Sequence, residues 1–369
     1  MFPPIITFLI VLSLLVFIHE FGHFLAAKKV GIKVEEFGFG YPPKIWGKKI
    51  GETIYSLNWI PFGGFVRLLG QEQLEEKKYS RRELKRAFFK QSKKARTLVL
   101  LAGILGNFLL GVICFSIIYS KLGIPKKLEF IKVMEVITGS PAQLGGLKKD
   151  DKIIKAAGQK VTNLTEFMKI VEENKGKEVI LETADRQLSI VPRENPPQNE
   201  GRLGVVITDI EMVFYPWWQQ PFLGAWEGLK EALSWGLMIF NGVIITILQL
   251  FKGITPQVAG PVGIFQLTSA AAKEGILNLI QFVGILSVNL AVLNFLPFPA
   301  LDGGHLVFVF IGDLLGKKRR AKVEYYVNLA GFIFLISIMM LVTVSDFIKL
   351  FKQSAFLINV FSFFQSFFK

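Results

Sequence analysis

The sequence predicts a polytopic α-helical membrane protein with about four transmembrane helices. Apolar residues make up 51% of the 369 residues, 35 residues are Phe, and the mean hydropathy is +0.44. These values exceed those of an ordinary soluble domain. The formal net charge of +14 comes from Lys and Arg residues that gather beside apolar stretches. Membrane topology and anionic lipid therefore explain the charge better than nucleic-acid binding does.

Residues 1–27 form the first expected transmembrane helix and contain the pentad HEFGH. A retained helix fits better than a cleaved signal peptide, because the start MFPP lacks a basic region and the pentad interrupts the apolar run. On a helix, His19 and His23 share one face and can hold a Zn²⁺ ion, with Glu20 beside them as the base that activates water. Polar groups are costly at this depth, which favours a functional role.

Residues 28–96 form a basic loop with 17 Lys or Arg against 7 Asp or Glu, so the positive-inside rule places the loop in the cytoplasm. Its first half mixes β-forming residues with Gly and Pro, which predicts a cytoplasmic or re-entrant β-rich loop of short strands. After a capping box at Ser80 and Glu83, we expect a basic amphipathic helix on the anionic membrane surface; a solvated helix face is the alternative. Residues 97–119 form the second expected transmembrane helix.

Residues 124–193 have soluble character and alternate short β-rich runs with a helix-like segment. This inserted extracytoplasmic α+β domain resembles a PDZ domain. The resemblance rests on Ser140-Pro141-Ala142, Gly145-Gly146-Leu147, Asp150-Asp151-Lys152-Ile153-Ile154 and Gly158-Gln159. It implies that an extended peptide adds a strand to the edge of the sheet. A purely structural module is the alternative.

Three further apolar stretches follow, at about residues 233–251, 276–296 and 326–345. The basic cluster after the second of them should face the cytoplasm, which requires an odd number of crossings after the external domain. We therefore expect Trp235–Phe251 to lie in the outer interface, within a linker and interfacial segment over 194–275. The basic cluster consists of Lys317, Lys318, Arg319, Arg320 and Lys322.

The remaining segments complete the expected topology. Residues 276–312 form the third transmembrane helix and a turn, 313–325 a basic cytoplasmic loop, and 326–369 the fourth transmembrane helix and a C-terminal tail. The N-terminus and the inserted domain then lie outside, and the HEFGH pentad lies near the cytoplasmic side.

Two histidines leave a catalytic zinc short of its usual third protein ligand. Asp302 is the expected third ligand, because it lies in a Gly-flanked turn after a helix that Pro297 and Pro299 break. Irregular backbone at membrane depth is tolerated only against protein or a wet cavity. The fourth metal position then stays open for water.

Other polar residues of the sequence compete with these three for metal ligation. His305 could bind metal, but a hydrogen-bonded or solvent-facing role is favoured. Asp313 and Asp346 lie near segment ends, where exposed carboxylates are ordinary. Asn107 in the second transmembrane helix either bonds across helices near the site or serves packing.

The combination of these motifs is similar to a known family. HEFGH in the first transmembrane helix, a PDZ-like domain after the second, and NxxPxPxLDGGH at the third resemble the site-2 proteases, specifically the bacterial regulators of sigma-E-type stress signalling. The resemblance implies that His19, His23 and Asp302 bind zinc, and that Glu20 is the base. It also implies a location in the bacterial inner membrane.

The resemblance further implies a substrate-binding asparagine upstream of the prolines. Asn294 occupies that position here, and Asn289 lies one helical turn and a residue earlier. Because a membrane-spanning substrate must unwind before cleavage, we hypothesise that Ile60–Leu68, which contains Gly63 and Gly64, offers it an edge strand. The chain has room for one PDZ-like domain, whereas well-known enterobacterial members have two in tandem.

The function implied by the family is regulated intramembrane proteolysis. The enzyme would cut in or near the transmembrane segment of single-span substrates, such as anti-sigma factors or signal-peptide remnants. Its other expected contacts are a peptide at the PDZ-like domain and membrane lipid, with no nucleic acid. A non-proteolytic PDZ scaffold and a metal or ion transporter are the alternatives. A transporter would more usually show repeated halves, and no internal repeat is found.

Overall fold

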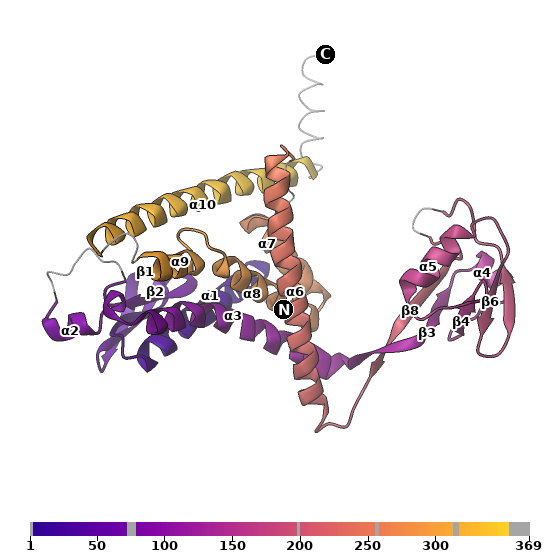
Figure 1. Cartoon of the computed structure of the whole chain (residues 1–369), viewed down its shortest axis with the longest axis horizontal. Coiled ribbons are helices and arrows are strands. Elements are labelled where there is room, and N and C mark those ends of the chain that lie inside the picture. Colours follow the sequence, from indigo (N-terminus) through magenta and orange to yellow (C-terminus); the bar gives the residue numbers. More distant parts are fainter. Residues whose placement is uncertain (1–2, 72–78, 198–199, 255–257, 313–316, 354–369) are drawn as a thin grey trace, which may run out of the picture. The chain divides into compact units, whose positions relative to one another are not determined.

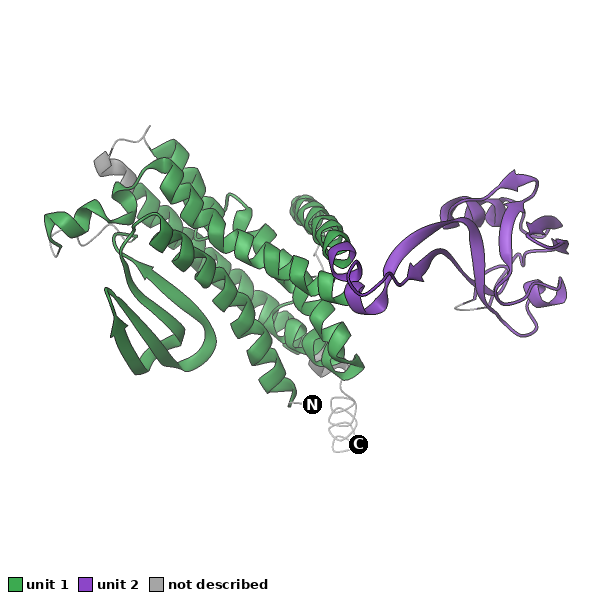
Figure 2. Cartoon of the chain, turned by 90° about the horizontal axis from the view of Figure 1, so that it is seen from below, with its two compact units in different colours: residues 1–118, 224–369 green, residues 119–223 purple. Residues whose placement is uncertain are grey.

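The computed structural model divides into two compact units (Figure 2). Unit 1 consists of Met1–Ile118 and Gly224–Lys369, and unit 2 is Tyr119–Leu223. The structure describes residues 3–71, 79–197, 200–254, 258–312 and 317–353. Residues 313–316 of the expected basic loop and 354–369 of the expected tail lie outside this range.

Five helices in the described residues are long and apolar enough to cross a membrane (Figure 1). The protein is therefore a helical, multi-pass membrane protein. The sequence predicted about four such helices and an interfacial helix over Trp235–Phe251. The structure extends that helix to 32 residues, which makes it the fifth candidate. The five are α1 (Pro4–Lys29), α3 (Lys93–Leu122), α6 (Gln220–Phe251), α8 (Ile276–Phe295) and Lys322–Lys349 of α10 (Lys317–Gln353).

A long β-hairpin follows α1 in the sequence. Its strands are β1 (Val34–Ile50) and β2 (Thr53–Leu68), which pair antiparallel with repeated register shifts. The sequence predicted several short strands joined by turns. The Gly and Pro residues are instead absorbed as bulges and bends inside two long strands.

The hairpin bends so that one part of β1 pairs on both sides. Residues 36–39 have partners in 64–67 and also in 54–57. Residues 64–68 have strand partners only in β1 among the described residues, so they form an edge of this small sheet. An edge strand presents backbone N–H and C=O groups that another chain can use.

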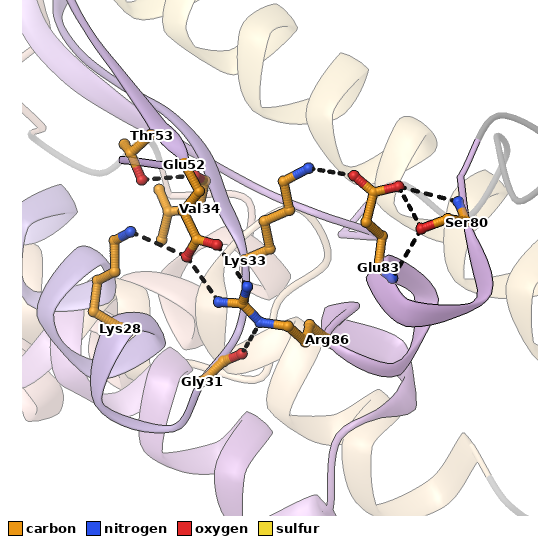
Figure 3. Close-up of polar contacts among 9 residues, drawn as sticks. All are labelled: Lys28, Gly31, Lys33, Val34, Glu52, Thr53, Ser80, Glu83 and Arg86. Atoms are coloured by element: carbon orange, nitrogen blue, oxygen red, sulfur yellow. Dashed lines mark hydrogen bonds and ion pairs between the residues drawn. The ribbon is translucent and has the colours of Figure 1, made fainter. Parts of the chain in front are cut away.

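A charged cluster of Lys28, Glu52 and Arg86 ties the hairpin turn to the end of α1 (Figure 3). The guanidinium of Arg86 donates to the two carboxylate oxygens of Glu52 at 2.5 and 2.7 Å, and its Nε donates to the carbonyl of Gly31 at 2.9 Å. The Lys28 ammonium lies 3.3 Å from Glu52. Hydrogen bonds from Arg86, followed by that from Lys28, lower the pKa of Glu52 to about 2.

The expected capping box at Ser80 is confirmed. The Ser80 hydroxyl accepts from the backbone N–H of Glu83, whose carboxylate accepts from the backbone N–H of Ser80 and from Lys33 at 2.7 Å (Figure 3). The box starts only a short helix, α2 (Arg81–Lys85), and a 3₁₀ turn over Phe88–Lys90 precedes α3. The chain thus breaks the continuous amphipathic helix that the sequence predicted.

Unit 2 is built around one antiparallel β-sheet, with two short helices, α4 and α5. Its strands follow the order β7-β6-β4-β3-β8, with β5 paired to β4. The buried core under the sheet includes Ile131, Val133, Phe167 and Leu181. The last strand, β8, pairs with β3 and lies beyond the expected segment 124–193. The elements are β3 (Ile124–Val136), α4 (Pro141–Leu144), β4 (Lys152–Ala156), β5 (Gln159–Lys160), α5 (Leu164–Glu173), β6 (Val179–Thr183), β7 (Gln187–Ile190) and β8 (Val205–Val213).

Asp346 was expected to be an ordinary exposed carboxylate, and that expectation is wrong. Asp346 is only 7% exposed, and its Oδ2 accepts from the backbone N–H groups of Gly260 and Gly263, both at 2.9 Å. These glycines begin α7 (Pro261–Glu274), which has no capping side chain of its own at Gly260. A carboxylate on α10 therefore caps the N-terminus of α7.

We predict that Asp346→Ala lowers the free energy of unfolding by about 1–2 kcal/mol, because it removes the cap of α7. Thermal unfolding in detergent measures the change. Ser337→Ala is the control, since among the described residues that hydroxyl bonds to the carbonyl of Ile333 in its own helix and to no other group. Equal effects of the two substitutions would contradict the assignment.

We also predict that the Glu52 cluster stabilises the hairpin in a pH-dependent way. The pKa of Glu52 is lowered from its ordinary 4.5 to about 2. Its contribution is therefore present above about pH 4.5 and is lost as the pH falls toward 2. The difference in Tm between wild type and Glu52→Gln should shrink over that interval, and a difference that stays constant would contradict the prediction.

Candidate metal centre

Three side chains from two distant segments converge inside unit 1. His19 and His23 lie one turn apart on α1, and Asp302 is the first residue of α9 (Asp302–Ile311). Oδ2 of Asp302 lies 3.0 Å from Nε2 of His19 and 3.2 Å from Nε2 of His23. The two Nε2 atoms are 3.1 Å apart. The structure thus brings together all three residues that the sequence nominated as ligands.

This arrangement fits a zinc ion. Zinc takes imidazole nitrogen and carboxylate oxygen at about 2.0–2.2 Å in a tetrahedron, whose corners are then about 3.3 Å apart. The three observed separations are close to that value. Two ligands from one helix, α1, and one from the start of α9 would leave the fourth corner free for water or substrate, which is the pattern of catalytic zinc sites.

The second nitrogen of His23 is held by the neighbouring helix. Nδ1 of His23 lies 2.8 Å from the backbone carbonyl of Val99 on α3 and can only donate to it. That hydrogen bond fixes the tautomer with the proton on Nδ1. The lone pair of Nε2 is then free to face Asp302 and a metal.

Asn107 on α3 holds the other imidazole. Its Nδ2 lies 3.4 Å from Nδ1 of His19, the residue is fully buried, and its Oδ1 has no hydrogen-bond partner in the described chain. Turning the amide so that Oδ1 accepts from Nδ1–H satisfies both groups and frees Nε2 of His19 for metal. The backbone carbonyl of Asn107 also accepts from Ser287 on α8 at 2.7 Å. Asn107 therefore both bonds across helices and supports the site.

Close helix packing makes these contacts possible. A Cβ added at Gly103 of α3 would lie 2.4 Å from Nε2 of His23. Any side chain at this position would occupy space beside the ligand. Gly103 therefore lets α3 approach α1 closely enough for Val99 and Asn107 to reach the imidazoles.

Glu20 lies beside the three converging groups and is tied to the hairpin. Its Oε2 accepts from the backbone N–H of Val66 on β2 at 3.0 Å. Glu20, the two histidines and Asp302 line a common pocket of about 250 Å³. A carboxylate in this place can take up and return a proton within the pocket.

The turn that carries Asp302 is supported by α10. Ala300 has a φ of 72°, and its backbone N–H donates to Oδ1 of Asn328 at 3.1 Å. Nδ1 of His305 lies 3.3 Å from Oε1 of Glu324 and 3.4 Å from Nδ2 of Asn328. His305 thus has the hydrogen-bonded role that the sequence favoured. Glu324 and Asn328 were not predicted from the sequence; their signal there is a pair of polar residues four apart at the start of an apolar helix.

Of the four residues expected to bind substrate, one, Asn294, lines the pocket. Phe65 and Val66 of β2 line it as well. Asn289 is not among the residues lining the pocket. Gly63 and Gly64 are not among them either, and they lie against α1 and β1.

We predict that Gly103→Ala lowers zinc affinity at least tenfold, because its methyl group displaces the His23 imidazole. Zinc content of purified protein after dialysis against a competing chelator measures the change. Gly242→Ala on α6 is the control, because no atom lies within 4 Å of its added Cβ. Unchanged zinc retention in a correctly folded Gly103→Ala variant would contradict the prediction.

Comparison with known proteins agrees with this site. The profile of peptidase family M50 matches residues 7–338. A protein of Clostridium perfringens named as a zinc metalloprotease is 36% identical over 347 residues, covering 93% of this chain and 98% of that protein. Zinc metalloprotease RasP of Geobacillus kaustophilus is 29% identical over 426 residues, with 94% and 98% covered. The regulator of sigma-W protease RasP of Bacillus subtilis is 27% identical over 434 residues, with 94% and 99% covered. The chain belongs to peptidase family M50 and is a zinc metalloprotease.

Proposed function

We propose that this enzyme hydrolyses a peptide bond in or near the transmembrane segment of single-span membrane proteins. The observation that carries the proposal is the convergence of His19, His23 and Asp302 beside Glu20, in a pocket that a β-strand also lines. A soluble protease has no need to build these groups on a helix long and apolar enough to cross a membrane.

Each polar group of the site then has a distinct role. His19, His23 and Asp302 hold the zinc, which when bound polarises the scissile carbonyl and lowers the pKa of water. Glu20 takes a proton from the attacking water and passes it to the leaving amine. Val99 and Asn107 keep the imidazole rings in the orientation that leaves Nε2 available.

The substrate is recognised as an extended strand. A helical segment keeps its carbonyl groups in internal hydrogen bonds, so it must unwind before cleavage. Apart from the Val66 N–H, which donates to Glu20, the edge 64–68 of β2 offers backbone groups to the unwound chain, and the amide of Asn294 adds a further hydrogen bond. Gly63 and Gly64 contribute by allowing β2 to pack closely on its neighbours.

The topology follows from charge and from this chemistry. The N-terminus and unit 2 lie outside a bacterial inner membrane, and the basic hairpin segment 28–96 lies at the cytoplasmic side with the site. Unit 2 carries a PDZ-type domain, which comprises the segment 124–193 and the added strand β8. This domain receives a peptide at an edge of its sheet. In this topology α6, although long and apolar enough to cross, lies in the outer interface over Trp235–Phe251, and α8 and the stretch Lys322–Lys349 of α10 supply the last two membrane crossings.

The class of substrate is supported by one relative. The Bacillus subtilis protein is named as a regulator of sigma-W protease. We propose substrates of the same regulatory kind, namely anti-sigma factors or signal-peptide remnants that another protease has already trimmed. A single PDZ-type domain then excludes bulky uncut ectodomains, and lipid contacts the helices around the site.

The decisive experiment compares wild type with Glu20→Gln, using a purified transmembrane test substrate in detergent. We predict that cleavage falls by about 10²–10⁴-fold, because the base is lost, while zinc content stays equal. Equal cleavage by both proteins would contradict the mechanism. Zinc-bound wild type that never cleaves would favour a PDZ scaffold, and zinc flux into proteoliposomes would favour a transporter.

A further inference from the structure

We propose that Ser13 is a positioning residue, which fixes the register of β2 along α1 and so holds the edge 64–68 beside Glu20. The proposal rests on the proposed function for its consequence in catalysis. The register itself is a property of the folded chain, and it can be measured without substrate. Ser13 lies on α1 two turns before Glu20 and is not among the residues that line the pocket.

The Ser13 hydroxyl makes two hydrogen bonds to the backbone of β2. It donates to the carbonyl of Pro61 at 2.7 Å and accepts from the backbone N–H of Gly63 at 3.3 Å. The residue is 7% exposed. One hydroxyl thus satisfies an acceptor and a donor on the same short stretch of strand, and a strand lifted from α1 would lose both bonds.

Three other buried or half-buried hydroxyls on helices behave differently, whereas Ser287 on α8 also bonds to a distant segment, the carbonyl of Asn107. Thr7 donates to the carbonyl of Pro3, Ser116 to that of Val112, and Thr268 to that of Ile264, each four residues back. That local bond is the usual way to satisfy a hydroxyl in an apolar helix. The Ser13 hydroxyl instead binds a strand about fifty residues away in the sequence, which points to a positioning role.

A second anchor lies two helical turns further on. The backbone N–H of Val66 donates to Oε2 of Glu20 at 3.0 Å. Seven residues of helix, from Ser13 to Glu20, rise about 10.5 Å. Three residues of strand, from Gly63 to Val66, extend about 10 Å. The two anchors therefore match in spacing, so one stretch of strand can meet both of them.

The contact between the anchors permits no other residue. Gly63 has a φ of 65°, and a Cβ added there would lie 2.5 Å from Cβ of Val16 on α1. A slip by one position would bring Phe62 or Gly64 to Val16 and turn every side chain of the strand to the opposite face. It would also move the N–H of Val66 about 3.3 Å along the strand, away from Glu20.

The consequence is a link between the substrate-binding strand and the base. Phe65 and Val66 line the pocket, and Val66 is also the residue whose N–H holds Glu20. While Ser13 holds the register of β2, the edge 64–68 stays at a fixed distance from the Glu20 carboxylate. Without the Ser13 hydroxyl the strand has one anchor, and both the strand edge and Glu20 gain freedom.

The first test measures backbone amide exchange in the full-length protein in detergent, with residue-level readout by mass spectrometry. Ser13→Ala should speed exchange about tenfold at both Gly63 and Val66, because loss of the first anchor loosens the second. Thr7→Ala, which removes a buried hydroxyl from the same helix, should leave both amides at the wild-type rate. Unchanged exchange at Val66 in Ser13→Ala would overturn the proposal, even if Gly63 alone became faster.

The second test follows cleavage of the transmembrane test substrate. Ser13→Ala should lower kcat/KM about tenfold, mainly through a higher KM, because the strand that binds substrate is no longer held. Ser13→Thr, which keeps the hydroxyl, should stay within about twofold of wild type. A loss confined to kcat, or an equal loss in Ser13→Thr, would overturn the positioning role.

The two tests separate this inference from the proposed function. If wild type cleaves nothing, the proposed function fails, whereas amide exchange still decides whether Ser13 fixes the strand. If wild type cleaves and Glu20→Gln does not, the proposed function stands, and only the Ser13 variants judge the inference.

Discussion

The constraint on which the structure depends is the placement of polar side chains on α1, a helix built to lie among apolar surroundings. An unpaired polar group at such a position costs several kcal/mol, so each one needs a partner from elsewhere in the chain. Nδ1 of His23 is paired with Val99, His19 with Asn107, and Glu20 with Val66. The packing of α3 and β2 against α1 brings these partners within hydrogen-bond distance. The contacts that build the site are therefore the same contacts that pack these elements together.

The parts of the site that the sequence predicts are those set by local spacing. His19, Glu20 and His23 follow from helix periodicity, and Asp302 follows from a turn marked by Pro and Gly. The partners that orient them come from long-range packing. Nothing near Val99 in the sequence shows that its carbonyl faces an imidazole, and Asn107 could be read in two ways. Backbone groups carry no sequence signal, which is why their roles appear only in the structure.

The fold shows the same division between local and distant information. The capping box at Ser80 is local and was predicted correctly. The length of the hairpin depends on how bulges absorb Gly and Pro, and residue type alone does not decide between a bulge and a turn. A helix cap is predicted from residues that directly precede the helix in sequence. Asp346 was not predicted as a cap because it lies on α10 and caps α7, a different helix.

The metal ligands come from the two sequence segments that make up unit 1. Metal binding is therefore linked to the assembly of the helices from both segments. His19 and His23 belong to α1, while Asp302 depends on a turn that Asn328 of α10 supports. A metal that binds only the assembled arrangement stabilises that arrangement, since binding energy and folding energy are then shared. The polar contacts of α10 therefore tie it both to the turn that carries Asp302 and to the start of α7.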